Sequence, residues 1–212
     1  MVELFTSQGC SSCPPADALI GELGQRADIL ALSQHVEYWD YLGWKDPFAS
    51  PLYSTRQREY AKALGLKYVY TPQIVIQGRV QLPGNEREAV LQAVADQGRP
   101  KEALLSIRFA APGQLVVDVA GKENARPADI WLVQYDRTQI TPIDRGENRG
   151  RELANYNVVR DLRRIGRWQG EPMQIAVDLG QEGAATIGCA ILLQAESAGP
   201  VLDAVRCAPR HG

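Results

Sequence analysis

The sequence predicts an α/β protein in which a first domain, residues 1–99, is followed by a smaller, mostly antiparallel, sandwich-like β domain, residues 100–212. Two observations predict this division. Strand-like and helix-like segments alternate in the first half, whereas short strands between turn residues fill the second half. With 212 residues, 45% of them hydrophobic and 23% charged, the chain is long enough for one large or two small domains.

Hydrophobic spacing and capping residues define the elements of the first half. Apolar residues at helical spacing indicate a first helix that ends at Gly24 and has the cysteines at its N-terminal end. Pro14 and Pro15 disfavour helical geometry at Cys13 and Pro14, so a later start of this helix is the alternative. Ser50 or Ser54 is the expected N-cap of the second helix and Asn85 that of the third. In chain order the predicted elements are a strand at 2–5, a helix at 16–24, a strand at 29–36, a helix at 51–64, strands at 69–76 and 79–82, and a helix at 86–97.

Short apolar segments between turn signals characterise the second half, and no convincing helix interrupts them. This pattern is typical of an antiparallel sandwich or sheet. The predicted strands are residues 104–110, 115–120, 130–135, 139–143, 158–162, 173–179, 185–194 and 201–207.

Two cysteines, Cys10 and Cys13, stand three residues apart where the first strand gives way to the first helix. At the N-terminal end of a helix, free backbone N–H groups and the helix dipole favour a thiolate over a thiol. The spacing therefore predicts a dithiol redox centre, with Cys10 attacking and Cys13 resolving the mixed disulfide. A purely structural disulfide is the alternative. Structural zinc needs four ligands, and the chain has no second close cysteine pair.

Thr71 and Pro72 lie just before the third strand of the first half. Strand–helix–strand followed by a hairpin and a helix is the order of thioredoxins, and the chain resembles them at this point and at the cysteine pair. The resemblance implies a cis-proline at Pro72 that faces the cysteines and leaves backbone groups open to an incoming peptide. The chain departs from thioredoxins at Leu4 and Gly9, which replace a buried proton-shuttling acid and an aromatic residue. Proton transfer from Cys13 therefore lacks its usual agent.

Four longer segments narrow the resemblance to an exported bacterial family called domain of unknown function 1223. It implies a thioredoxin-like domain with a C-terminal β-rich extension, normally made with a leader for export, and no established substrate. The segments are Phe5–Asp17, His35–Phe48, Tyr70–Gln73 and Arg145-Gly146-Glu147-Asn148.

The segment between the second strand and the second helix places five aromatic residues in eleven positions, 38–48, without helical or strand period. Trp39, Tyr41 and Trp44 are candidates for a substrate groove beside the cysteines, although packing of the loop onto the core explains them equally well. His35 and Asp40 flank this segment as a candidate acid/base pair or metal ligand. A satisfied structural histidine is the alternative.

Cys189 and Cys207 lie on predicted strands of the second half, where a disulfide between them or two buried free thiols are both open. An even cysteine count favours an oxidising compartment. We therefore expect a periplasmic or secreted protein whose leader is absent from this sequence. A net charge of −2 gives no electrostatic case for a nucleic-acid partner, and no apolar run approaches the roughly 20 residues of a membrane span.

The main functional hypothesis is a thiol–disulfide oxidoreductase-like protein that acts on protein or small-molecule disulfides without a cofactor or resident metal. Two other classes remain open. One is a copper-handling protein that binds the soft metal through Cys10, Cys13 and His35. The other is a partner-binding module in which the dithiol has no catalytic role. The sequence leaves the substrate, the direction of electron flow and the oligomeric state open.

Overall fold

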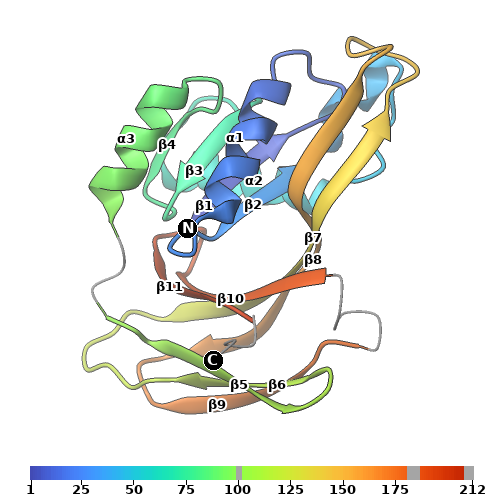
Figure 1. Cartoon of the computed structure of the whole chain (residues 1–212). Coiled ribbons are helices and arrows are strands. Elements are labelled where there is room, and N and C mark those ends of the chain that lie inside the picture. Colours follow the sequence, from blue (N-terminus) through green and yellow to red (C-terminus); the bar gives the residue numbers. More distant parts are fainter. Residues whose placement is uncertain (99–101, 181–186, 208–212) are drawn as a thin grey trace.

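The structure, a computed structural model, describes residues 1–98, 102–180 and 187–207. Two sheets form its framework, one of eight strands and one of three (Figure 1). Three α-helices belong to the first half of the chain, and every described element after residue 98 is a strand. The chain is therefore α/β and mostly strands, with a large mixed sheet and a small antiparallel one.

The first half begins close to the predicted pattern. Pro14 and Pro15 occupy the first turn of the first helix, where a missing N–H costs no hydrogen bond, so the helix begins directly after Cys13 and the alternative of a later start does not hold. Ser50 caps the second helix through the N–H of Leu52, and the third is preceded by Glu86, not Asn85. The elements are β1 (Val2–Thr6), α1 (Pro14–Gln25), β2 (Ala31–His35), a 3₁₀ helix η1 (Glu37–Leu42), α2 (Pro51–Ala63), β3 (Gln73–Ile76), β4 (Val80–Pro83) and α3 (Arg87–Gln97).

The second half consists of longer strands than the turn signals predict. The expected strands at 130–135 and 139–143 are one continuous strand, and the short strand expected at 158–162 is the middle of a 17-residue strand. Residues 185 and 186 of another expected strand lie outside the described residues. The strands are β5 (Leu105–Ala111), β6 (Gln114–Val119), β7 (Ala128–Pro142), β8 (Glu152–Trp168), β9 (Met173–Asp178), β10 (Ile187–Ala195) and β11 (Val201–Arg206).

The large sheet crosses the boundary expected between residues 99 and 100. Its strand order is β11-β10-β7-β8-β2-β1-β3-β4, so four strands of the second half continue the sheet begun by the first. The link is a parallel bridge between Ser33 on β2 and Val158 on β8. β1 pairs in parallel with β2 and antiparallel with β3. The division into two folding units stays a prediction, but the hydrogen-bonded framework is shared.

Alternation along β1 assigns one core to each face of the sheet. Leu4 packs with residues of α1 and α3, such as Leu19 and Val90, whereas Phe5 packs with Tyr60 of α2 on the other face. Gly21 allows α1 to approach β8, because a Cβ there would lie 2.7 Å from the Tyr156 ring. Both faces of the sheet around β1 are therefore covered. The loop that connects β1 to α1 begins at the buried end of β1.

The small sheet, ordered β5-β6-β9, forms a separate layer at the end of the molecule away from α1 (Figure 1). Its inner residues pack against β7, β8 and β10, where Trp168 is fully buried. Only this part of the second half has the sandwich-like arrangement predicted for residues 100–212. No helix among the described residues is long and apolar enough to cross a membrane.

Candidate functional site around the Cys10–Cys13 disulfide

Cys10 and Cys13 form a disulfide at the start of α1, with their Cα atoms 5.5 Å apart. Cys13 is the N-cap residue and already has helical dihedral angles, φ −79° and ψ −34°. Its carbonyl accepts the N–H groups of Ala16 and Asp17 at 2.9 and 3.1 Å, so the helical geometry holds through both prolines. The disulfide is therefore held directly at the N-terminal end of a 12-residue helix.

The two sulfurs differ slightly in access. Cys10 is 2% exposed and Cys13 is fully buried. The Ser12 hydroxyl lies 3.4 Å from Cys10 Sγ, as expected for a serine that can donate to this sulfur. The backbone N–H of Ser11 has a different partner, because it donates to Glu147 at 3.1 Å. Both cysteine residues are therefore buried, and access distinguishes them only slightly.

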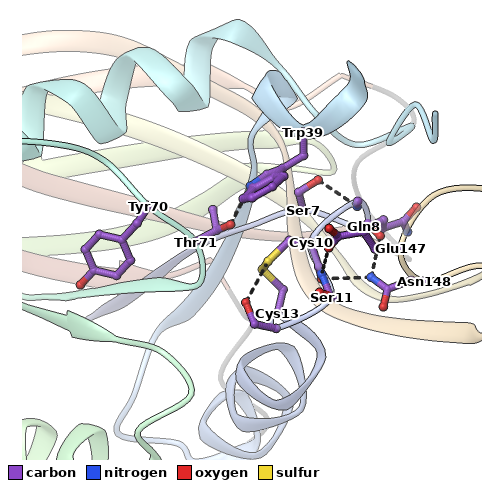
Figure 2. The surroundings of a disulfide bond; sticks show 12 residues. Ser7, Gln8, Cys10, Ser11, Cys13, Trp39, Tyr70, Thr71, Glu147 and Asn148 are labelled. Atoms are coloured by element: carbon purple, nitrogen blue, oxygen red, sulfur yellow. Dashed lines mark hydrogen bonds between the residues drawn. A yellow bond between two sulfur atoms is a disulfide. The ribbon is translucent and has the colours of Figure 1, made fainter. Parts of the chain in front are cut away.

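The peptide bond between Thr71 and Pro72 is cis. The Pro72 carbonyl accepts the N–H of Gly84 at 2.9 Å, which fixes the loop to the end of β4. In the described part of the chain, Thr71 uses neither its N–H nor its C=O in a backbone hydrogen bond. Trp39 joins this loop to the cysteine loop. Its Nε1–H donates to Thr71 Oγ1 at 2.7 Å, and its ring and Thr71 lie together on one side of the disulfide (Figure 2).

The other candidate aromatics lie farther from the sulfurs. Trp44 is half-buried and donates its Nε1–H to Gln8 Oε1 at 3.0 Å, so it packs against the loop that precedes Cys10. Tyr41 is 78% exposed and stands at the end of η1. The segment expected to lack regular structure thus contains a 3₁₀ helix, which Gly43 ends at φ 98°. Of the three candidates, Trp39 is the one that the structure places against both loops.

The connection between β7 and β8 covers the cysteine loop from the opposite side (Figure 2). Asn148 is fully buried and its Nδ2 donates to the carbonyls of Gln8 and Cys10 at 2.9 and 3.0 Å. Beside it, Glu147 accepts the N–H of Ser11. Sequence reasoning missed both roles. The Arg145-Gly146-Glu147-Asn148 segment was recognised as part of the family resemblance, but the sequence did not show that it lies next to the cysteine loop.

Gln8 fastens the same loop to the strands beneath it. Its Nε2–H₂ donates to Thr141 Oγ1 at 3.0 Å and to Asn155 Oδ1 at 2.9 Å, which places β7 and β8 directly next to the end of β1. Its backbone N–H donates to Asp46 at 2.8 Å. Residues from both halves of the chain therefore build the surroundings of the disulfide.

His35 is fully buried and pairs with Asp46, not with Asp40, through a contact of 2.7 Å between Nδ1 and Oδ2. Burial lowers the pKa of His35, but the carboxylates of Asp46 and Asp17 outweigh it and raise that pKa above its ordinary value. Burial raises the pKa of Asp46, yet His35 and two backbone N–H groups hold it below its ordinary value. Asp40 is not the partner of His35 in this pair; its Oδ1 accepts the backbone N–H of Asp46 at 3.2 Å.

Two acids near the N-terminus occupy opposite faces of the sheet. Glu3 is buried on the face of α2, where it pairs with Arg56 at 2.7 Å and accepts from Tyr60. Asp17 is 3% exposed on α1, on the face of the cysteines, and burial raises its pKa to about 6. Sequence reasoning noted Asp17 only as the end of a motif. Its burial depends on β8, which no local pattern places there.

A second disulfide joins Cys189 on β10 to Cys207 just after β11. The N–H of Cys207 also donates to the carbonyl of Cys189 at 2.8 Å, so the bond closes the edge of the large sheet. Across residues 1–98, 102–180 and 187–207, no cluster of three or more His, Cys, Asp or Glu side chains is arranged to hold a metal ion.

Comparisons with known proteins agree with a shared fold over the whole chain. No curated protein matches. A protein of Agrobacterium tumefaciens with a known crystal structure is 31% identical, with a TM-score of 0.82, and the match covers 100% of this chain and 94% of that one. HBP35 of Porphyromonas gingivalis is 13% identical with a TM-score of 0.59 over 97% and 73% of the two chains, a likeness of fold alone. The family model described as "Protein of unknown function (DUF1223)" matches residues 1–194, and the chain therefore belongs to the DUF1223 family.

Proposed function

We propose that this protein is a thiol–disulfide oxidoreductase-like protein in which Cys10 exchanges disulfides with a protein or small-molecule substrate and Cys13 resolves the mixed disulfide. The observation that carries the proposal is the Cys10–Cys13 disulfide at the N-terminus of α1, with Trp39 and Thr71 together on one side of it (Figure 2). A disulfide that served only to hold the fold would not need this position, where helix N–H groups and the dipole stabilise a thiolate.

The roles of the two cysteines follow from their access. Cys10, a residue that is 2% exposed, is assigned as the nucleophile, and Cys13, which is fully buried at the N-cap of α1, as the resolving cysteine. Its thiolate breaks the substrate disulfide, releases one substrate thiol and forms a mixed disulfide. Cys13 then attacks Cys10 Sγ and releases the second thiol, so two electrons pass to the substrate. The reverse sequence oxidises a substrate dithiol.

The arrangement of the first half supports a thioredoxin-like scaffold for this chemistry. β1 and β2 are parallel and connected by α1, and the β3–β4 hairpin and α3 follow, with β3 antiparallel to β1. Pro72 precedes β3, and its neighbour Thr71 keeps its backbone N–H and C=O free of backbone partners in the described structure. We assign substrate binding to Thr71 and Pro72, since an extended peptide can pair with such groups.

Trp39 is the aromatic residue best placed to contact a substrate, because it bridges the cysteine and cis-proline loops. Tyr41, which is exposed on η1, and Trp44, which packs on Gln8, would extend the binding surface away from the sulfurs. Two disulfides in one chain also favour an extracytoplasmic location, where the oxidised form persists.

Reduction of insulin disulfides by dithiothreitol, followed by turbidity, tests the proposal. The wild-type protein should accelerate the reaction, and Cys10→Ser should abolish the acceleration. Cys13→Ser should instead trap a mixed disulfide that mass spectrometry detects. The matched control is Cys189→Ser with Cys207→Ser, which removes the other disulfide and should leave the acceleration in place. Unchanged activity in Cys10→Ser would overturn the proposal.

A further inference from the structure

A buried polar cluster lies under the cysteine loop, between α1 and the ends of β1, β2 and β8. Thr6 and His35 are register partners in the parallel pair of β1 and β2, so their side chains face α1 together. Asp17 on α1 and Asn155 on β8 complete the cluster, and all four residues are 3% exposed or less. Asp46 holds His35 from the side.

This cluster contains several polar atoms without partners. Asp17 Oδ1, Thr6 Oγ1, His35 Nε2 and Asn155 Nδ2 are buried and make no hydrogen bond of normal geometry among the described residues, although Thr6 and Asn155 lie close enough to Asp17 to lower its pKa. Buried polar groups are normally satisfied by protein or by ordered water, and such groups gathered at one place suit a bound water. A carboxylate, an imidazole nitrogen and a hydroxyl around one position form a set of groups that can accept and pass on a proton.

Asp17 lies four residues after Cys13 on the same helix. Because Cys13 has helical dihedral angles and its carbonyl accepts the Asp17 N–H, helical spacing applies between them. Residues four apart on a helix are neighbours on one face. Cys13 is fully buried, so its thiol cannot lose a proton directly to solvent. Glu3 is not available to it, since it is paired with Arg56 on the other face of the sheet.

We infer that Asp17, with His35 and a buried water, accepts the proton of the Cys13 thiol when the mixed disulfide is resolved. The inference rests on the proposed function. In this step the Cys13 S–H bond breaks and its proton passes to the Asp17 carboxylate. The Cys13 thiolate attacks Cys10 Sγ, the Cys10–substrate bond breaks, and the departing substrate thiolate takes a proton. No further oxidant or reductant is needed.

The electrostatics of the cluster suit this task near neutral pH. Burial raises the pKa of Asp17 to about 6, while His35 and Thr6 act to lower it, and the Asp46 charge acts to raise it. Arg160 on β8 also acts on His35, lowering its pKa. No charged side chain of β1 faces Asp17, since Thr6 is its neighbour there. A base whose pKa lies near the working pH transfers protons efficiently.

A titration without substrate tests the contact between the two groups. The Cys13 thiol pKa is measured from the ultraviolet absorbance of its thiolate in Cys10→Ser protein, with Cys10→Ser, Cys13→Ser as the blank. Adding Asp17→Asn should lower the Cys13 pKa by at least about one unit, because an ionised Asp17 opposes a second negative charge. Adding Glu22→Gln, an exposed acid of the same helix, should not change it. An equal pKa in all three proteins would overturn the inference.

A single-turnover experiment tests the proton transfer itself. Reduced protein is mixed with oxidised glutathione, and the mixed disulfide on Cys10 is followed by acid quenching and mass spectrometry. In Asp17→Asn the mixed disulfide should form at the wild-type rate but be resolved about 100-fold more slowly near neutral pH. Asp17→Glu should restore part of the rate. Resolution with the wild-type pH profile in Asp17→Asn would refute the role.

Two further measurements keep the outcome clear. Thr6→Val keeps the side-chain shape and removes a hydroxyl that lowers the Asp17 pKa, so it should shift the resolution profile to higher pH even if Asp17→Asn folds poorly. A wild-type protein that never forms a mixed disulfide on Cys10 would contradict the proposed function, whereas the thiol titration would still decide whether Asp17 and Cys13 interact.

Discussion

Replacing Asn148 with alanine removes the side chain through which the β7–β8 connection holds the cysteine loop. Asn148 is fully buried and donates to two carbonyls, those of Gln8 and Cys10. A buried acceptor left without a partner costs about 1–3 kcal/mol. Asn148→Ala leaves the Gln8 carbonyl without a partner among the described residues, whereas the Cys10 carbonyl keeps the N–H of Cys13 at 3.3 Å, so we expect the free energy of unfolding to fall by about 1–3 kcal/mol.

Urea denaturation of the oxidised protein, followed by tryptophan fluorescence, measures this loss. Asn85→Ala is the control, since Asn85 is exposed and does not cap α3, and its effect should stay within about 0.5 kcal/mol. The Asn148 variant should also be reduced faster by dithiothreitol at Cys10–Cys13, because the loop is no longer held. A loss below about 1 kcal/mol would refute the assignment of Asn148 as the anchor of the loop.

Three more predictions concern other parts of the molecule. Trp39→Ala removes the hydrogen bond to Thr71 and the ring that lies on one side of the disulfide, so dithiothreitol should reduce the Cys10–Cys13 disulfide severalfold faster; an unchanged rate would show that the ring does not shield it. Cys189→Ser with Cys207→Ser opens a loop with a sequence separation of 18 and should lower the free energy of unfolding by about 3 kcal/mol in urea. Asp17 has a raised pKa, so the folded protein binds its proton more tightly than the unfolded chain, and stability is lost as pH rises from 3.8 to about 6. Asp17→Asn should therefore gain about 3 kcal/mol relative to wild type between about pH 3 and pH 8, and a pH-independent difference would argue against the buried carboxylate.

Local sequence signals were sufficient for the elements around the cysteines. The α/β class, the short strand before Cys10 and the helix cap depend on neighbours within a few residues. The class and the strand are confirmed, and of the two candidate caps Ser50 is the one used. The cysteines lie at the N-terminal end of α1 as expected, and the alternative of a later start does not hold, because proline is favourable in the first turn of a helix.

Sequence could not reveal the partners that come from β7 and β8. The long strand β8 contains the short apolar run that was predicted. The rest of β8 was not predicted as a strand because it carries charged residues, which a strand paired on both sides tolerates where they reach solvent. His35 was matched with Asp40 by proximity in sequence, whereas the chain turns so that Asp46 meets the ring. Pairings at long range, such as that of Gln8 with Asn155, have no local signal.

The distance along the chain between Cys10 and Asn148 has a consequence for biosynthesis. The two residues are 138 positions apart, and chains are made at roughly 5–20 residues per second. The cysteine loop therefore emerges on the order of 10 seconds before the segment that encloses it is made. During that interval both thiols are accessible to any oxidant or folding catalyst that meets the nascent chain. Their access is restricted only once the β7–β8 connection has been made and has folded over the loop.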